Sequence, residues 1–155
     1  FGAGEKVPMP KIQQEFICVC DKEIQPLAER EWEESGHYDV PLDINWDAYF
    51  EYEEAGKLRL YTARDEGKLI GYIVVLLIEP LTTKSEVVGY FEAAFVDRPN
   101  RQSRLGLEIF RFAESCLKKE GVTRVIANSS AKNPIGKFLE KMGYKELDTK
   151  YDKVL

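Results

Sequence analysis

Only one histidine and three cysteines occur among the 155 residues, so the sequence offers few strong metal ligands. The cysteines are Cys18, Cys20 and Cys116, and an odd number with two of them one residue apart does not suit a disulfide framework. A zinc site is disfavoured because His37 is the lone histidine. We therefore expect no bound metal and three free thiols, as in a reducing cytoplasm.

Long apolar runs are also missing. The longest one, residues 69–78, is interrupted by Gly71 and Tyr72 and falls short of the ~20 residues that a membrane-spanning helix needs. No secretory signal pattern is visible. These absences predict a cytoplasmic protein without a membrane partner.

Positive charge is too scarce for a general nucleic-acid binder, since the formal net charge is -5. The acidic residues are concentrated between residues 29 and 54, where ten of them are opposed only by Arg30. Two interpretations stay open. The cluster binds a cationic ligand, or it simply solvates two helices.

Hydrophobic periodicity predicts one α/β domain in the order βααβββαβαββ. We expect one mixed sheet with helices on both faces, formed by residues 12–155. Residues 1–11, which begin with Phe1, are expected to be a disordered or tag-like N-terminus. The expected strands are residues 12–20, 58–63, 69–78, 86–96 and 122–128, with two more in 144–155; the expected helices begin near Asp21, Asp43, Leu105 and Asn133.

The most informative stretch joins the strand at residues 86–96 to the following helix. The first turn of a helix carries backbone N–H groups without intrahelical partners and the positive end of the helix dipole, which suits phosphate. Arg101 and Arg104 add positive charge, and Gly106 allows a ligand to approach the backbone. The alternative is an ordinary strand-to-helix turn with two solvated arginines.

This loop resembles the acyl-CoA loop of the GNAT superfamily of N-acetyltransferases, R/Q-x-x-G-x-G/A after a strand that carries valine. Val96, Arg101 and Gly106 match the pattern. Arg104 stands where the middle glycine is usual, as in a subgroup associated with bacteriophage genomes. Residues 133–144 are similar to the family's closing helix, N-x-x-A-x-x-F-Y-E-K-x-G-F, in which Asn133 and Phe138 have their counterparts.

The resemblance implies the GNAT fold, with a mostly antiparallel sheet of about six to seven strands. It also implies an N-acetyltransferase that moves an acetyl group from acetyl-CoA to a primary amine by direct attack, without a metal. The acceptor would be a small-molecule or Lys-type cationic amine, and a homodimer is expected. Residues expected to bind acetyl-CoA are Phe95, Val96, Arg101, Gln102, Ser103, Arg104, Leu105, Gly106, Leu107, Asn133 and Phe138.

Glu92 is the first candidate for the base that deprotonates the amine, although it could equally be a solvent-facing strand residue. Ser130 is a candidate for positioning a water or the thiol, or a simple cap. Tyr90 is a candidate acid, or a packing residue. His37 lies in a region that borders the family's acceptor site, or is merely exposed.

One mismatch bears on the mechanism. The family's tyrosine that protonates the departing thiolate corresponds to Leu139 here. An alternative function is therefore a non-catalytic binding protein on the GNAT scaffold, such as a phage accessory, virion-associated or host-target-binding protein, that can still bind CoA.

Overall fold

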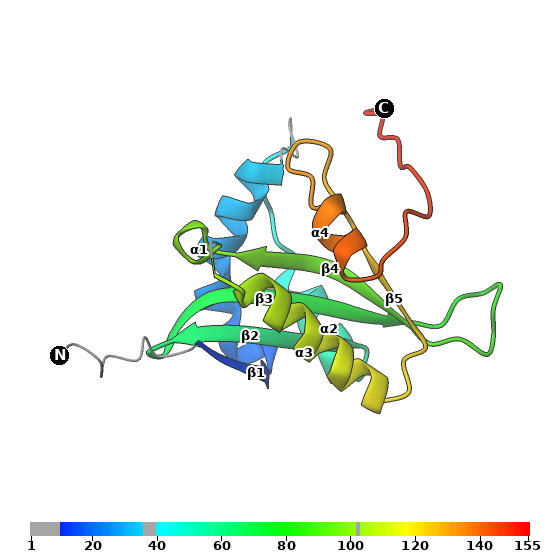
Figure 1. Ribbon diagram of the computed structural model, residues 1–155, viewed down its shortest axis with the longest axis horizontal. Helices are drawn as coiled ribbons and strands as arrows, with labels where there is room; N and C mark the ends of the chain where they lie inside the picture. The colour runs from blue at the N-terminus through cyan, green and yellow to red at the C-terminus, as the bar shows by residue number, and fades with distance from the viewer. Residues whose placement is uncertain (1–9, 36–39, 102) are drawn as a thin grey trace.

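The computed structural model describes residues 10–35, 40–101 and 103–155 of the chain. The elements follow one another as β1 (Lys11–Glu15), α1 (Ile17–Ser35), α2 (Trp46–Glu54), β2 (Leu58–Asp65), β3 (Lys68–Ile78), β4 (Val88–Val96), a 3₁₀ turn η1 (Arg98–Asn100), α3 (Leu105–Lys119), β5 (Arg124–Ala127) and α4 (Gly136–Lys141). The predicted mixed α/β fold is confirmed (Figure 1).

A single sheet organises the domain. Its five strands lie in the order β1-β2-β3-β4-β5, with antiparallel pairs up to β4 and a parallel pair between β4 and β5. The predicted hairpin forms around Glu66 and Gly67, whose φ angles of 48° and 82° suit a tight turn between twisted strands. The second strand of this hairpin, β3, is buried over most of its length, as its dense apolar sequence predicts.

Helices cover both faces of the sheet. α3 and α4 pack on one face through a core that includes Leu105, Ile109 and Leu139. α1 and α2 cover the other face, where Ile24 and Leu27 meet side chains of β2, β3 and β4. Figure 1 shows α3 crossing in front of the strands with α1 behind them. α3 buries Phe110 and Leu117 as well.

The first predicted strand is too long. β1 ends at Glu15, and α1 starts at Ile17, so Asp21 lies inside the helix and does not cap it. The carboxylate of Glu53 accepts hydrogen bonds from the backbone N–H groups of Ile17 (2.6 Å) and Cys18 (3.2 Å) and thereby satisfies the first turn of α1. A contact with α2, distant in sequence, therefore sets this boundary.

Two other helix starts are also shifted. The side chain of Asn45, rather than that of Asp43, caps α2 by accepting from the Ala48 N–H at 3.0 Å. α4 begins at Gly136 rather than at Asn133. The Ser129 hydroxyl accepts a 2.8 Å hydrogen bond from the Ile135 N–H just before the helix, which replaces the cap expected from asparagine.

The predicted sheet of six to seven strands is wrong in its count. The two strands expected within residues 144–155 do not form, and residues 142–155 carry neither helix nor strand. Leu147, Tyr151 and Leu155 in this segment are exposed, so its apolar side chains find no core to stabilise a strand. The split between an N-terminal segment 1–11 and a domain 12–155 stays a prediction; residues 1–9 lie outside the described part, and Lys11 is the first residue of β1.

Candidate active site

β4 and β5 run together and then separate. Val88 to Phe91 on β4 pair with Arg124 to Ala127 on β5, whereas β4 continues to Val96 without a further β5 partner among the described residues. Along this part of β4, the backbone groups that point away from β3 therefore have no partner strand, and the Val96 carbonyl among them accepts from Arg101. An extended molecule with amide groups is the kind of ligand that pairs with such an edge.

A β-bulge lies where the strands part. In the pairing of β3 with β4, Val74 is opposite Ala93 and Val75 is opposite Phe91, so Glu92 is the extra residue. Phe91 packs in the α3 core, and Ala93 packs on the opposite side with α1 and α2. The bulge thus turns Glu92 toward the α1 and α2 face, where its carboxylate accepts a 2.7 Å hydrogen bond from the Tyr49 hydroxyl.

The start of α3 lies at the far end of β4, beyond η1. Arg104 occupies the N-cap position and makes no side-chain capping hydrogen bond. The Ser103 hydroxyl accepts a 3.3 Å hydrogen bond from the Leu105 N–H. A Cβ on Gly106 would meet no atom within 4 Å, so the approach to the backbone is open there. The remaining N–H groups of this first turn suit an anion.

Arg101 is already engaged. Its guanidinium donates to the Val96 carbonyl at 2.7 Å and to Glu34 of α1 at 2.6 Å, and it lies 5.1 Å from the ring centroid of Phe95. Arg98 donates to the same glutamate at 3.0 Å. These contacts tie the loop after β4 to the C-terminal end of α1. Gln102, also predicted to bind acetyl-CoA, lies outside the described residues.

Two carboxylates on the α1 and α2 face, Glu31 and Glu92, each accept a hydrogen bond from a tyrosine hydroxyl. The Tyr72 hydroxyl donates to Glu31 at 2.7 Å. Burial raises the pKa of Glu31 to about 7; the hydrogen bond from Tyr72 opposes the shift, and the negative charges of Glu92 and Glu34 add to it. Glu92 is exposed, but the groups around it displace part of its hydration, and this desolvation raises its pKa. The hydrogen bond from Tyr49 acts in the opposite direction.

Burial likewise raises the pKa values of the Tyr49 and Tyr72 hydroxyls, so both stay protonated and act as donors to the two carboxylates. Neither Glu31 nor Tyr72 stands out in the sequence, where Glu31 is only one of ten acidic residues between positions 29 and 54. The spacing of residues in α1 could have predicted the position of Glu31. It follows Leu27 by four residues and Ile24 by seven, so it lies on the buried side of the helix.

Tyr90 lies on β4 two residues before Glu92. Its hydroxyl oxygen accepts a 2.5 Å hydrogen bond from the Asn128 amide, and the Lys150 ammonium lies 5.4 Å from the centroid of its ring. The Ser130 hydroxyl donates to the Ser35 carbonyl at the end of α1, at 2.9 Å. Ser130 therefore links the loop after β5 to α1.

Residues of the closing helix contribute mainly to packing. Phe138 stacks edge-on against Phe110 of α3 at 5.4 Å between ring centroids, and Leu139 is buried in the same core. Asn133 precedes α4 and is exposed. His37, between α1 and α2, lies outside the described residues.

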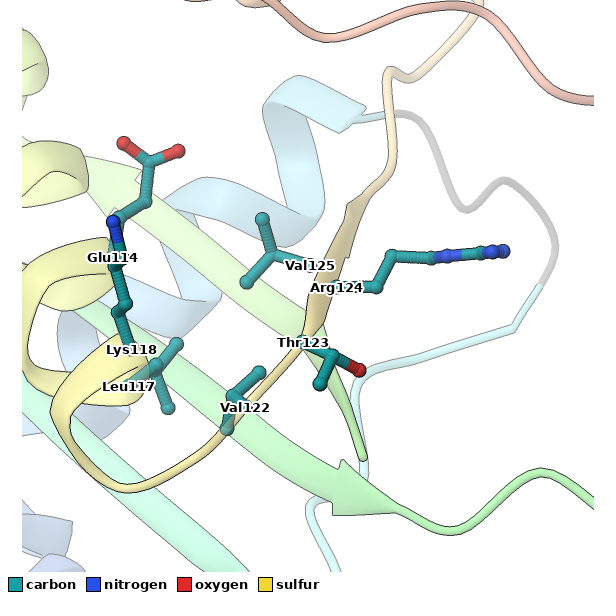
Figure 2. Close-up of a pocket in the computed structure, with 7 residues that line it drawn as sticks. All are labelled: Glu114, Leu117, Lys118, Val122, Thr123, Arg124 and Val125. Carbon is teal, nitrogen blue, oxygen red and sulfur yellow. The ribbon is translucent and has the colours of Figure 1, made fainter. Parts of the chain in front are cut away.

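A separate surface depression of about 400 Å³ lies between the C-terminal half of α3 and the start of β5. Figure 2 shows Leu117, Val122 and Val125 at its apolar wall, with Glu114 and Lys118 beside them. None of the predicted site residues lines it.

Two other features are missing from the part of the chain that the structure describes. It contains no group of three or more potential ligands that could hold a metal ion. It also contains no helix with the length and apolar character of a membrane span.

Comparison with solved structures shows how the same fold is used elsewhere. AAC(6')-Iy, solved in complex with the bisubstrate analogue CoA-S-monomethyl-acetylneamine, is 20% identical with a TM-score of 0.72, over 96% of this chain and 100% of that one. A predicted acetyltransferase from Clostridium acetobutylicum, solved with acetyl-CoA, is 13% identical with a TM-score of 0.72, over 94% and 96% of the two chains. Ribosomal-protein-alanine N-acetyltransferase from Brucella melitensis is 13% identical with a TM-score of 0.71, over 96% and 99%.

At these identities the solved structures establish the fold alone. A search of curated proteins found no match. The family model described as acetyltransferase (GNAT) family matches residues 22–144, which include β4, the start of α3 and the closing helix. The chain therefore belongs to the GNAT family of acetyltransferases.

Proposed function

We propose that the protein transfers an acetyl group from acetyl-CoA to a primary amine. The observation that carries this proposal is the separation of β4 from β5 beside the start of α3. The unpaired edge of β4 offers hydrogen bonds to the amide groups of the pantetheine arm, and the first turn of α3 offers N–H groups to the pyrophosphate. Family membership supports the same assignment.

The residues expected from the sequence to bind acetyl-CoA have different parts in this proposal. Ser103, Leu105, Gly106 and Leu107 supply backbone groups at the start of α3, with the exposed Arg104 beside them. Phe95 and Val96 form the end of β4, and Asn133, which precedes α4, is proposed to border the site. Phe138 supports the site from the core, and Arg101 reaches the phosphates only when it leaves Glu34.

Glu92 is the proposed proton acceptor for the amine. It lies at the bulge, next to the edge of β4 along which the thioester would lie, and its raised pKa suits a base that must take a proton near neutral pH. An acidic face also favours a cationic acceptor, such as a Lys side chain or a small polyamine. Tyr90 is proposed as the acid, and Ser130 as the group that positions a water or the thiol; both hydroxyls are already hydrogen-bonded.

The proposed activity is tested in two steps. Isothermal calorimetry measures binding of acetyl-CoA, and absence of binding at millimolar ligand contradicts the proposal. Release of free thiol from acetyl-CoA is then followed with a panel of mono-, di- and polyamines. Amine-dependent thiol release, with an acetylated product seen by mass spectrometry, is the expected result.

A second candidate function is a binding protein on the same scaffold, favoured by Leu139. This side chain is 7% exposed and has no proton to give where the family's tyrosine would donate one. Calorimetry that shows acetyl-CoA binding, combined with no thiol release for any amine, would favour this second function.

Three finer expectations remain proposals. A homodimer is supported by the open outer edge of β5, the last strand of the sheet, and by the exposed apolar side chains of residues 147–155. Action in the cytoplasm is a proposal that rests on the composition alone. Origin in a bacteriophage, which would place the protein in the host cytoplasm, rests on Arg104 alone. Light scattering tests the homodimer.

A further inference from the structure

Glu31 is a carboxylate placed on the core-facing side of α1. Ile24 and Leu27 precede it by seven and four residues and are both 3% exposed. A helix brings residues at this spacing onto one face, so α1 directs Glu31 toward the sheet. There the Tyr72 hydroxyl of β3 donates to it at 2.7 Å. The helix thus holds an ionisable group in a position that its neighbours use for packing.

The charges around Glu31 come from each element packed against it. Tyr72 of β3 donates to it, and the negative charges of Glu92 on β4 and of Glu34 on its own helix act on it. From α2 comes Tyr49, whose hydroxyl donates to Glu92 at 2.7 Å. The charge of Glu34 is offset by two arginines of the loop after β4, Arg98 at 3.0 Å and Arg101 at 2.6 Å. Glu92, in contrast, forms no ion pair with an arginine or lysine among the described residues. Its negative charge near Glu31 is therefore not offset.

Two carboxylates in one partly enclosed cluster influence each other's protonation. Glu31 is the more deeply enclosed of the two; its pKa lies near 7 mainly because of burial, and the charge of Glu92 contributes to the shift. Coupling between two sites is reciprocal, so the charge of Glu31 must raise the proton affinity of Glu92 by the same free energy. A base of higher proton affinity removes a proton from an ammonium group more readily.

We propose that Glu31 is a positioning residue that acts through Glu92: once ionised, Glu31 strengthens Glu92 as the acceptor of the ammonium proton. This inference rests on the proposed acetyl transfer. One N–H bond of the ammonium breaks as an O–H bond forms on Glu92. The amine lone pair then attacks the thioester carbonyl and the C–S bond breaks. A second nitrogen proton leaves with the sulfur as CoA thiol, and Glu92 returns its proton to water.

The coupling is tested first without turnover. NMR with ¹³C-labelled glutamate carboxyls follows the titration of Glu31 in the wild-type protein and in Glu92→Gln. We expect the midpoint of Glu31 to fall in the variant because the neighbouring negative charge is gone. An unchanged midpoint would show that the two carboxylates are not coupled, and it would overturn the inference whatever the enzyme activity.

The effect on catalysis is then measured as the ratio of kcat/KM between wild type and Glu31→Gln at each pH. The titration of the amine itself cancels in this ratio. We expect the ratio to rise about tenfold between about pH 6 and about pH 8, as Glu31 gains its charge. Glu33→Gln, the same charge change at an exposed site on α1, should give a flat ratio.

Tyr72→Phe adds a readout that a structural role would not produce. The lost hydroxyl donates to the carboxylate of Glu31 and favours its ionised form. In Tyr72→Phe, the increase of kcat/KM that accompanies ionisation of Glu31 should therefore occur at higher pH than in the wild-type protein. A flat ratio for Glu31→Gln, or no displacement in Tyr72→Phe, contradicts the inference. If no amine supports turnover, the proposed function fails, while the NMR titration still decides the coupling.

Discussion

Arg101 donates to Glu34 at 2.6 Å and so joins the loop that precedes α3 to the end of α1. Arg101 is one of the residues that the sequence predicts to bind acetyl-CoA. In the structure its charge is already neutralised by a carboxylate that is 14% exposed. Phosphate binding through Arg101 must therefore compete with this ion pair, and the competition can be measured.

Glu34→Gln should increase the affinity for acetyl-CoA. The variant releases Arg98 and Arg101 from their shared carboxylate, so both can approach an anion at the start of α3. We expect a gain of about three- to tenfold in calorimetry at low salt, within the range of partly exposed ion pairs. Glu33→Gln is the matched control on the same helix. A loss of affinity in Glu34→Gln would mean that Glu34 positions the loop for binding instead of competing with it.

Arg104→Ala should weaken CoA binding by about five- to tenfold, because an exposed arginine beside a phosphate adds a charge-assisted hydrogen bond. The effect should shrink when the salt concentration is raised. Arg111→Ala, an exposed arginine further along α3, serves as the control and should leave the affinity unchanged. Equal affinities for Arg104→Ala and wild type would remove Arg104 from the site.

Gly106→Ala should affect folding and binding in opposite directions. A Cβ there meets no atom within 4 Å, and alanine is the better helix residue, so thermal unfolding should show a gain of about 0.5 kcal/mol. The same methyl group would lie where, in the proposed site, the backbone approaches a phosphate, so affinity for CoA should fall several-fold. A variant that is more stable and binds CoA as tightly as wild type would refute the close approach at Gly106.

Glu15 should make stability depend on pH at the acidic end. Burial alone would raise its pKa, but hydrogen bonds from Arg64 and Thr62 outweigh it and lower the pKa from 4.5 to about 2. A lowered folded-state pKa means that the stabilisation is present above about pH 4.5 and is lost as the pH falls toward about 2.

Glu15→Gln should therefore lose about 1–2 kcal/mol of unfolding free energy at neutral pH, a figure reduced for the solvent around the carboxylate. Urea denaturation at about pH 7 and about pH 3 measures the difference, which should shrink at the lower pH. Glu66→Gln, exposed in the turn between β2 and β3, is the control. A loss that is equal at both pH values would show that the charge of Glu15 is not the cause.

Local patterns predicted much of the fold. The alternation in β2, the dense apolar run in β3 and the helical spacing in α3 each depend on neighbours in the sequence, and each element formed. Element ends were less predictable. α1 begins at Ile17 because Glu53 of α2 caps it, and that contact spans 36 residues of sequence. The last two expected strands failed because residues 145–155 are exposed, so their apolar side chains find no core to pack against.

The sequence by itself determined the order of elements as far as α4, the helix start at Leu105 and the likeness to acetyltransferases, because turns, caps and motifs are local. Only the tertiary structure decided which charged groups meet. It paired Arg101 with Glu34 and Tyr49 with Glu92, and it set Glu31 against Tyr72. Each pair joins residues that are at least 41 positions apart, and packing, not local pattern, fixes such contacts. The β4 bulge that turns Glu92 toward α1 and α2 is likewise decided by the tertiary structure, because a bulge is defined by how β4 pairs with β3.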